Sequence, residues 1–170
     1  SVRVAPTPLL MVEDDARDAE LALMALERAG IAVDATIVDN EDDFRAALVR
    51  GGFELVISDF HMPRFSGASA LKITQALQPQ LPFIVVSGML GEERAVDMVR
   101  SGATDYVVKQ RLDRLPMVVR RALAEAEERQ RRARAEARLR DRESYFAQLI
   151  GTLRDFSVAS LDAQGAITSW

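Results

Sequence analysis

The most constraining feature of this sequence is a regular alternation between short apolar runs and longer stretches with helical spacing. The apolar runs are predicted to be strands, at residues 9–12, 33–38, 55–58, 83–87 and 104–108. The stretches with helical spacing, most of them ended by Gly or Pro, are 16–29, 41–50, 68–77, 91–100 and the chain from about 113. Five strand–helix units in tandem predict a doubly wound α/β fold, with a five-stranded parallel sheet covered on both faces.

Residues that follow each apolar run form the candidate site, because a doubly wound sheet places ligands beyond the carboxyl ends of its strands. These residues are Glu13, Asp14, Asp15, Asp59, Ser87 and Lys109. Gathered carboxylates repel one another unless a cation lies among them, and an all-oxygen ligand set favours Mg²⁺. Glu13 and Asp14 are the predicted metal pair, and Asp15 is expected to cap the next helix. Capping alone is the alternative explanation of these acids.

Asp59 comes directly after a buried strand, where packing does not explain a carboxylate, although capping of the following loop is an alternative. A carboxylate beside Mg²⁺ is a competent nucleophile toward phosphorus. Lys109 would add a second positive contact, and the Ser87 hydroxyl would donate a hydrogen bond. Lys109 or Ser87 alone would more often be an ordinary surface residue. Together with Glu13, Asp14 and Asp59, at the ends of four strands, they predict a single site for phosphoryl transfer.

Composition excludes several other kinds of site. There is no cysteine, so neither disulfides nor thiolate metal sites are possible, and the single histidine, His61, excludes a histidine-clustered zinc site. No apolar run approaches the roughly 18–20 residues of a membrane span, and the first residues lack a signal-peptide pattern. These observations favour a cytoplasmic protein with no membrane contact.

Charge is unevenly distributed along the chain. Residues 1–110 carry ten basic and seventeen acidic side chains, whereas residues 111–143 carry eleven basic and seven acidic ones, and every cation in this second block is Arg. Acids are interleaved and no aromatic residue lies among them, which favours a solvated helix with ion pairs over a nucleic-acid patch. Residues 116–150 are therefore predicted to form one long helical linker.

The apolar seam of this linker is weak. Its members approximate a heptad repeat and are Val119, Leu123, Ala126, Ala133 and Ala137. The seam predicts a parallel homodimer through a coiled coil, and a solvated monomeric helix is the alternative. Residues 151–170 change pattern: Phe156–Leu161 alternates, 162–165 is a predicted turn, and a strand is expected from Ile167. They predict the start of a second, α+β domain.

Four segments together resemble the signature segments of CheY-like response-regulator receiver domains from bacterial two-component systems. They are Met-Val-Glu-Asp-Asp at 11–15, Leu-Val-Ile-Ser-Asp-Phe-His-Met-Pro at 55–63, Val-Val-Ser-Gly at 85–88 and Gly-Ala-Thr-Asp-Tyr-Val-Val-Lys at 102–109. The resemblance covers about residues 7–125 in the right order and spacing. It implies a flavodoxin-like receiver fold with strand order 2-1-3-4-5.

The same resemblance implies a role for each matching residue. Asp59 would accept a phosphoryl group from a histidine kinase or phosphotransfer protein, with no enzymatic activity beyond this self-catalysed transfer. Asp14 would bind Mg²⁺ directly, Glu13 through water, and the backbone carbonyl of His61 would complete the protein ligands. Ser87 and Tyr106 match the pair that switches on phosphorylation. The C-terminal helix would then transmit the state to a downstream sensor or output module.

Gln110 departs from the family pattern, which usually has Pro after the lysine, so the resemblance does not specify the geometry of the loop before the last helix. Two other functions are alternatives to a phosphorylated receiver. An unphosphorylated dimerising receiver would lack an acid or the lysine, and none is missing. A phosphatase of the haloacid-dehalogenase type needs an acid two residues after the nucleophile, where this chain has His61.

Residues 145–170 resemble the beginning of a PAS sensor domain, which typically opens with a helix and then two strands joined by an Asp/Gly turn. This second resemblance implies a hybrid receiver–PAS protein longer than this chain. It leaves open whether that protein is a histidine kinase or another signalling enzyme.

Overall fold

The computed structural model describes residues 5–88 and 91–163, without the side chains of 154–163. Its strands are β1 (Thr7–Val12), β2 (Val33–Val38), β3 (Leu55–Asp59), β4 (Phe83–Ser87) and β5 (Asp105–Val108). Its α-helices are α1 (Ala16–Arg28), α2 (Glu41–Arg50), α3 (Gly67–Leu77), α4 (Glu92–Arg100) and α5 (Leu115–Ala163), and a 3₁₀ helix, η2 (Lys109–Arg114), precedes α5. Each of the five strands predicted for the sheet is present within two residues of its expected bounds.

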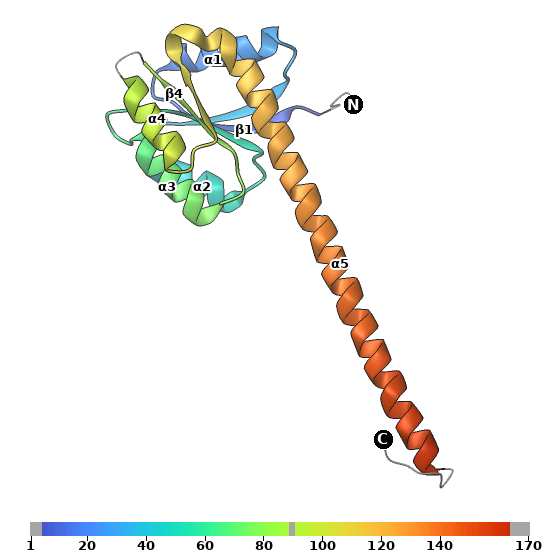
Figure 1. Cartoon of the computed structure of the whole chain (residues 1–170). Helices are drawn as coiled ribbons and strands as arrows, with labels where there is room; N and C mark the ends of the chain where they lie inside the picture. The colour runs from blue at the N-terminus through green and yellow to red at the C-terminus, as the bar shows by residue number, and fades with distance from the viewer. Residues whose placement is uncertain (1–4, 89–90, 164–170) are drawn as a thin grey trace. The chain divides into compact units, whose positions relative to one another are not determined.

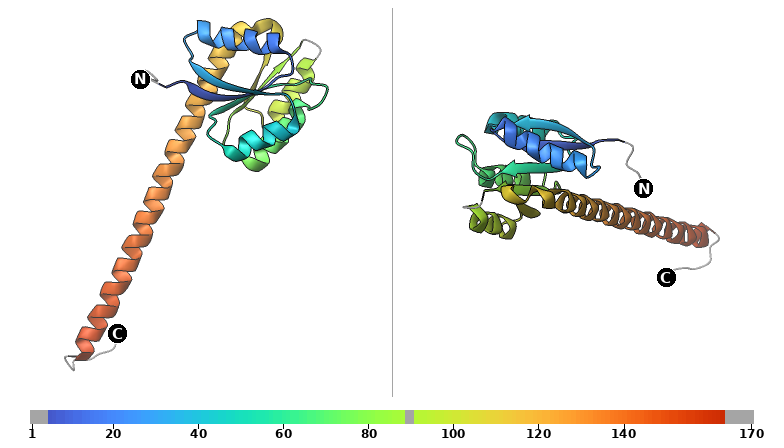
Figure 2. Two further views of the ribbon diagram at one scale, coloured as in Figure 1. Left: turned by 180° about the vertical axis from the view of Figure 1, so that it is seen from behind. Right: turned by 90° about the horizontal axis from the view of Figure 1, so that it is seen from above.

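The strands form one parallel sheet in the order β2-β1-β3-β4-β5, which confirms the predicted fold class and topology. Helix α1 and the first turns of α5 cover one face, and α2, α3 and α4 cover the other (Figures 1 and 2). Because both faces are covered, the central strands are apolar on both sides, and this is why their sequences are continuous apolar runs.

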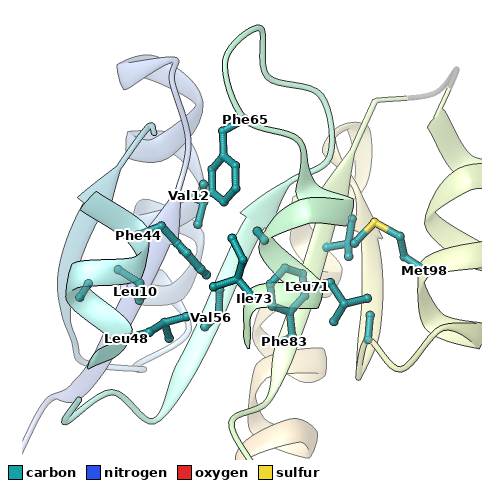
Figure 3. Packing of buried hydrophobic residues seen from close by; sticks show 14 of the residues in the cluster. Leu10, Val12, Phe44, Leu48, Val56, Phe65, Leu71, Ile73, Phe83 and Met98 are labelled. Atoms are coloured by element: carbon teal, nitrogen blue, oxygen red, sulfur yellow. The ribbon is translucent and has the colours of Figure 1, made fainter. Parts of the chain in front are cut away.

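Alternate residues of each central strand point to opposite faces of the sheet. In β1, Leu10 and Val12 pack against α2 and α3, whereas Leu9 and Met11 pack against α1 and α5. Figure 3 shows the first of these two cores, in which Phe44 of α2 meets Phe65 of the β3–α3 loop with ring centroids 5.5 Å apart. The core therefore anchors the loop that follows the last residue of β3.

Helix starts follow the expected capping chemistry. The Asp15 carboxylate accepts the backbone N–H groups of Arg17 at 2.8 Å and Asp18 at 3.2 Å, so the prediction that Asp15 caps α1 is confirmed. Gly67 begins α3 in close contact with the end of β3. A Cβ atom at Gly67 would lie 2.7 Å from the carbonyl oxygen of Asp59 and 2.9 Å from the Cα of Phe60. Only glycine lets α3 start this close to the strand.

The segment after β5, which holds Gln110, forms a short 3₁₀ helix. The chain enters η2 at Lys109, and Arg111 inside it has a non-helical backbone with φ −128° and ψ 48°. Helix α5 starts at Leu115, two residues after the predicted start. Its first turns are buried through Leu115, Val118, Val119 and Ala122.

Two predictions about the last third of the chain need correction. Val119, the first position of the predicted dimer seam, is fully buried in the core, and Leu123 packs against the same core. The predicted strand at 156–161 is wrong, because α5 continues through Gly151 to Ala163. A strand needs a neighbour to satisfy its backbone, and the described sheet ends at β2 and β5, whereas a helix satisfies its backbone locally. The strand expected from Ile167 lies outside the described residues.

The chain divides into two compact units, residues 1–127 and 128–170. The first holds the sheet and all the helices that cover it. In the second, every described side chain from Arg129 to Leu153 is exposed. Among the described residues, no helix is both long enough and apolar enough to cross a membrane.

Candidate functional site

Strand register brings the predicted site residues to one edge of the sheet. Val12 at the end of β1 pairs with Ser58, so Glu13 emerges next to Asp59. Ser87 at the end of β4 pairs with Val108 at the end of β5, so Lys109 follows at the same edge of the sheet. Carboxylate oxygens of Glu13, Asp14 and Asp59 lie within 4.8 Å of one another. The structure therefore brings the three predicted acids together.

Burial differs sharply among these acids. Asp59 is 4% exposed and Glu13 is 8% exposed, whereas Asp14 is open to solvent. Asp59 is held by its own strand end: its Oδ1 accepts the backbone N–H of His61 at 3.3 Å, and its backbone carbonyl accepts the Ser58 hydroxyl at 2.9 Å. The His61 side chain is exposed. The Asp59 carboxylate therefore has a fixed orientation in a nearly closed pocket.

The Lys109 ammonium is the cation among these carboxylates. Its Nζ lies 3.0 Å from Asp59 Oδ2 and 3.9 Å from Glu13 Oε2. Its nearest partner is a third acid, Asp18 of α1, whose Oδ2 accepts a hydrogen bond from it at 2.7 Å. The lysine therefore joins the ends of β1, β3 and β5 to the first turn of α1.

Asp18 was not predicted from the sequence as a site residue. An acid in the first turn of a helix is fully explained by the helix dipole, and this ordinary role conceals the contact with Lys109. The available signal was its spacing: Asp18 lies four residues after Asp14, about one helical turn farther along a segment that starts at the site.

The pKa values of Glu13 and Lys109 both lie above their ordinary values. Burial, followed by the nearby Asp59 charge, raises the pKa of Glu13 from 4.5 to about 8, although the backbone N–H of Asp15 and the Lys109 charge act in the opposite direction. Burial alone would lower the pKa of Lys109. Its hydrogen bonds to Asp18 and Asp59 outweigh burial and hold that pKa above its usual range. Without a metal ion, the pocket therefore favours a protonated Glu13 and a charged lysine.

Ser87 and Tyr106, the predicted switch pair, lie on the two strands at the β5 edge of the sheet. Ser87 is 1% exposed, and its Oγ has no hydrogen-bond partner within the part of the chain that the structure describes. Tyr106 is half-buried, pairs in register with Val85 and packs against the core under α3 and α4. A buried hydroxyl without a partner is costly, so Ser87 is poised to accept or donate a hydrogen bond when a suitable group arrives.

Comparison with known proteins gives this arrangement a family. The model of the response regulator receiver domain matches residues 9–120. The transcriptional regulatory protein ZraR of Salmonella typhimurium is 31% identical over 121 residues, which are 71% of this chain and 27% of that protein. The response regulator protein FleR of Pseudomonas aeruginosa is 35% identical over 119 residues, which are 69% of this chain and 25% of that protein.

Solved structures agree with these matches. The receiver domain of NtrX from Brucella abortus superimposes with a TM-score of 0.62 at 29% identity, covering 68% of this chain and 98% of that one. The chain spans about a quarter of the length of the two curated relatives, so the likeness concerns the receiver region. On the extent of the family match, and with an acidic cluster and a lysine at the expected strand ends, this chain belongs to the response regulator receiver domains, the phosphoacceptor domains of two-component signalling.

Proposed function

We propose that Asp59 accepts a phosphoryl group from a phosphohistidine on a histidine kinase or phosphotransfer protein. The placement of its carboxylate carries the proposal: it is nearly buried, it lies 3.0 Å from the Lys109 ammonium, and it adjoins Glu13 and Asp14. An Asp59 oxygen attacks phosphorus, the P–N bond breaks, and its electron pair stays on the imidazole nitrogen. Lys109 then holds a phosphoryl oxygen by a charge-assisted hydrogen bond.

The acidic cluster fits Mg²⁺. Three carboxylates within 4.8 Å repel one another, and a hard divalent cation with oxygen ligands relieves that repulsion. The side chains that would hold the ion are Glu13, Asp14 and Asp59, with the backbone carbonyl of His61 as a further ligand. Bound Mg²⁺ supplies charge neutralisation for the phosphoryl oxygens.

The Ser87 hydroxyl and the Tyr106 ring are the proposed switch. The hydroxyl, buried and without a partner in the described residues, would donate to a phosphoryl oxygen on Asp59. Tyr106 would repack against the neighbouring core. One hydrogen bond of about 1.4 kcal/mol is enough to shift a two-state equilibrium tenfold.

Incubation with acetyl phosphate tests the proposed function. We expect the mass of the intact chain to increase by one phosphoryl group when Mg²⁺ is present and the increase to be lost when the ion is chelated. Peptide mapping after reductive trapping should place the label on residue 59. Labelling at full rate without a divalent ion, or on a different residue, would contradict the proposal.

The raised pKa of Glu13 predicts a pH-dependent affinity for Mg²⁺. The ion needs the carboxylate, so with a pKa of about 8 the affinity should be about tenfold weaker at pH 7 than above pH 8.5. Calorimetry in buffers with different heats of ionisation should detect release of about one proton at pH 7. Glu13→Gln should show weak, pH-independent binding. An unchanged affinity between pH 6.5 and 9 in the parent chain would refute this prediction.

The folding stability of the metal-free protein should fall as pH rises, whereas the affinity for Mg²⁺ should increase. The folded pKa of Glu13 lies above its ordinary value of 4.5, so its contribution to stability is fully present below pH 4.5. That contribution is lost as pH rises to and through about 8. Added Mg²⁺ should therefore stabilise the fold most at the alkaline end of this window.

We propose that α5 carries the signal to a downstream module and pairs with a second copy of the chain. Support comes from large apolar side chains that are exposed at spacings of seven, three and four residues: Leu139, Phe146, Leu149 and Leu153. The resemblance of residues 145–170 to the opening of a PAS domain supports a sensor as that module. A cytoplasmic location and the absence of nucleic-acid binding stay predictions.

Sedimentation tests the pairing of α5. The chain should sediment as a dimer at micromolar concentration, and replacement of Leu139, Phe146 and Leu153 by Ala should shift it toward monomer. Replacement of three exposed arginines on the same helix by Lys, which keeps charge and length, is the control. A parent chain that is monomeric with and without phosphorylation would rule out signalling through this helix pair.

A further inference from the structure

The shortest contact of the Lys109 ammonium is with a residue outside the proposed nucleophile and metal cluster. Asp18 Oδ2 lies 2.7 Å from Nζ, compared with 3.0 Å for Asp59 Oδ2. Asp18 is one-third exposed and its position is fixed by α1, since its backbone N–H donates to the capping carboxylate of Asp15. The Lys109 ammonium is therefore shared between Asp59 at the site and Asp18 on the helix.

An ammonium has three N–H donors. Asp18 and Asp59 each take one, which leaves one donor for an incoming phosphoryl oxygen. Asp18 also contributes a negative charge next to the place where a dianionic phosphodonor must bind. At this distance and partial exposure, like charges repel appreciably, and salt screens the repulsion.

We propose that Asp18 is a positioning residue that fixes the Lys109 ammonium between α1 and β3 and weakens its hold on the incoming phosphoryl group. This inference rests on the proposed role of Asp59 as acceptor. In the reaction with acetyl phosphate, an Asp59 oxygen attacks phosphorus and the bond from phosphorus to the acetate oxygen breaks. The electron pair leaves with acetate and no proton transfer is needed. Asp18 forms and breaks no covalent bond; it sets how much positive charge the donor encounters.

Saturation kinetics with acetyl phosphate and Mg²⁺ test this inference on the full chain. Asp18→Asn keeps an oxygen that accepts the Lys109 hydrogen bond but removes the charge. The donor concentration for half-maximal rate should fall about threefold to tenfold at low salt, with little change in the maximal rate. The difference should shrink as ionic strength rises. Asp18→Glu, which keeps the negative charge, should behave like the parent chain.

Glu20→Gln provides the matched control, because it removes the same charge from an exposed position on the same helix. A half-saturation value for Asp18→Asn that equals that of the parent chain or of Glu20→Gln overturns the inference, and so does a higher value. Thermal melts of Asp18→Asn and Asp18→Glu show whether both variants are folded. Should Asp18→Asn unfold, Asp18→Glu still decides: a half-saturation value different from that of the parent chain overturns the inference.

An Asp59→Asn arm separates this inference from the proposed function. Labelling that persists in Asp59→Asn means that the proposed acceptor is wrong, whatever Asp18 does. Labelling that requires Asp59 but is indifferent to the charge at position 18 leaves the proposed function intact and removes only the role of Asp18.

Discussion

Replacing Asp59 by Asn should abolish phosphoryl incorporation, lowering the rate by about a thousandfold or more. The amide is a poor nucleophile, and it removes the charge that Lys109 and the metal cluster share. The fold should survive, because the amide oxygen can still accept one of the two contacts that the carboxylate makes, from the His61 N–H or from the Lys109 ammonium. The measurement is phosphate incorporation from acetyl phosphate with Mg²⁺, followed by intact mass.

Asp34→Asn is the control for this substitution, since Asp34 is exposed on β2 and lies near the opposite end of the sheet. It should label at the parent rate. A second readout checks the electrostatic argument: because the Asp59 charge is the second cause of the raised pKa of Glu13, that pKa should fall in Asp59→Asn. NMR titration of the Glu13 carboxyl would measure it. Normal labelling of the Asn variant would remove Asp59 as the acceptor.

Gly67→Ala should damage both the fold and the site, although it adds only one methyl group. The new Cβ would meet the Asp59 carbonyl oxygen at 2.7 Å, and both that atom and the Phe60 Cα belong to backbone that cannot move as a side chain does. Overpacking of this kind typically costs about 1–3 kcal/mol of stability. Displacement of the acceptor by as little as about 1 Å could reduce phosphorylation up to a hundredfold.

Gly151→Ala makes the same chemical change in α5, where a Cβ meets nothing within 4 Å. This control should leave labelling unchanged and slightly strengthen the helix, because Ala is the better helix former. Denaturant melts and acetyl phosphate kinetics on both variants make the comparison. Parent-like stability and labelling for Gly67→Ala would show that the contact between α3 and the end of β3 is less rigid than its geometry implies.

Much of the fold follows from local pattern. The apolar runs at 9–12, 55–58 and 83–87 are long enough and uniform enough to specify strands buried on both faces, and parallel topology then forces their polar ends together. For this reason the proximity of Glu13, Asp14, Asp59 and Lys109 could be predicted without coordinates.

Other features could not be predicted, for identifiable reasons. Asp18 satisfies a local rule as a first-turn acid, and this ordinary role conceals its distant contact with Lys109. That the buried Ser87 Oγ has no hydrogen-bond partner among the described residues depends on three-dimensional packing, which sequence pattern does not specify. The alternation at 156–161 predicts a strand only if a neighbouring strand exists, and the structure continues α5 there instead. Val119 fits both a dimer seam and a domain core, and spacing alone does not distinguish the two.

The contacts of Lys109 also have a consequence for how the domain assembles. The lysine pairs with partners 50 and 91 residues earlier in the chain, so β5, the last strand of the described sheet, delivers this ammonium to the site. Contacts of such sequence separation carry a high loop-closure entropy and form late in folding. A chain that has joined β1 to β3 but has not yet docked β5 holds its acids together without their counter-charge. Completion of the sheet and arrival of the lysine charge at its acidic edge are thus one event, and an incompletely folded domain lacks the contact between Lys109 and Asp59.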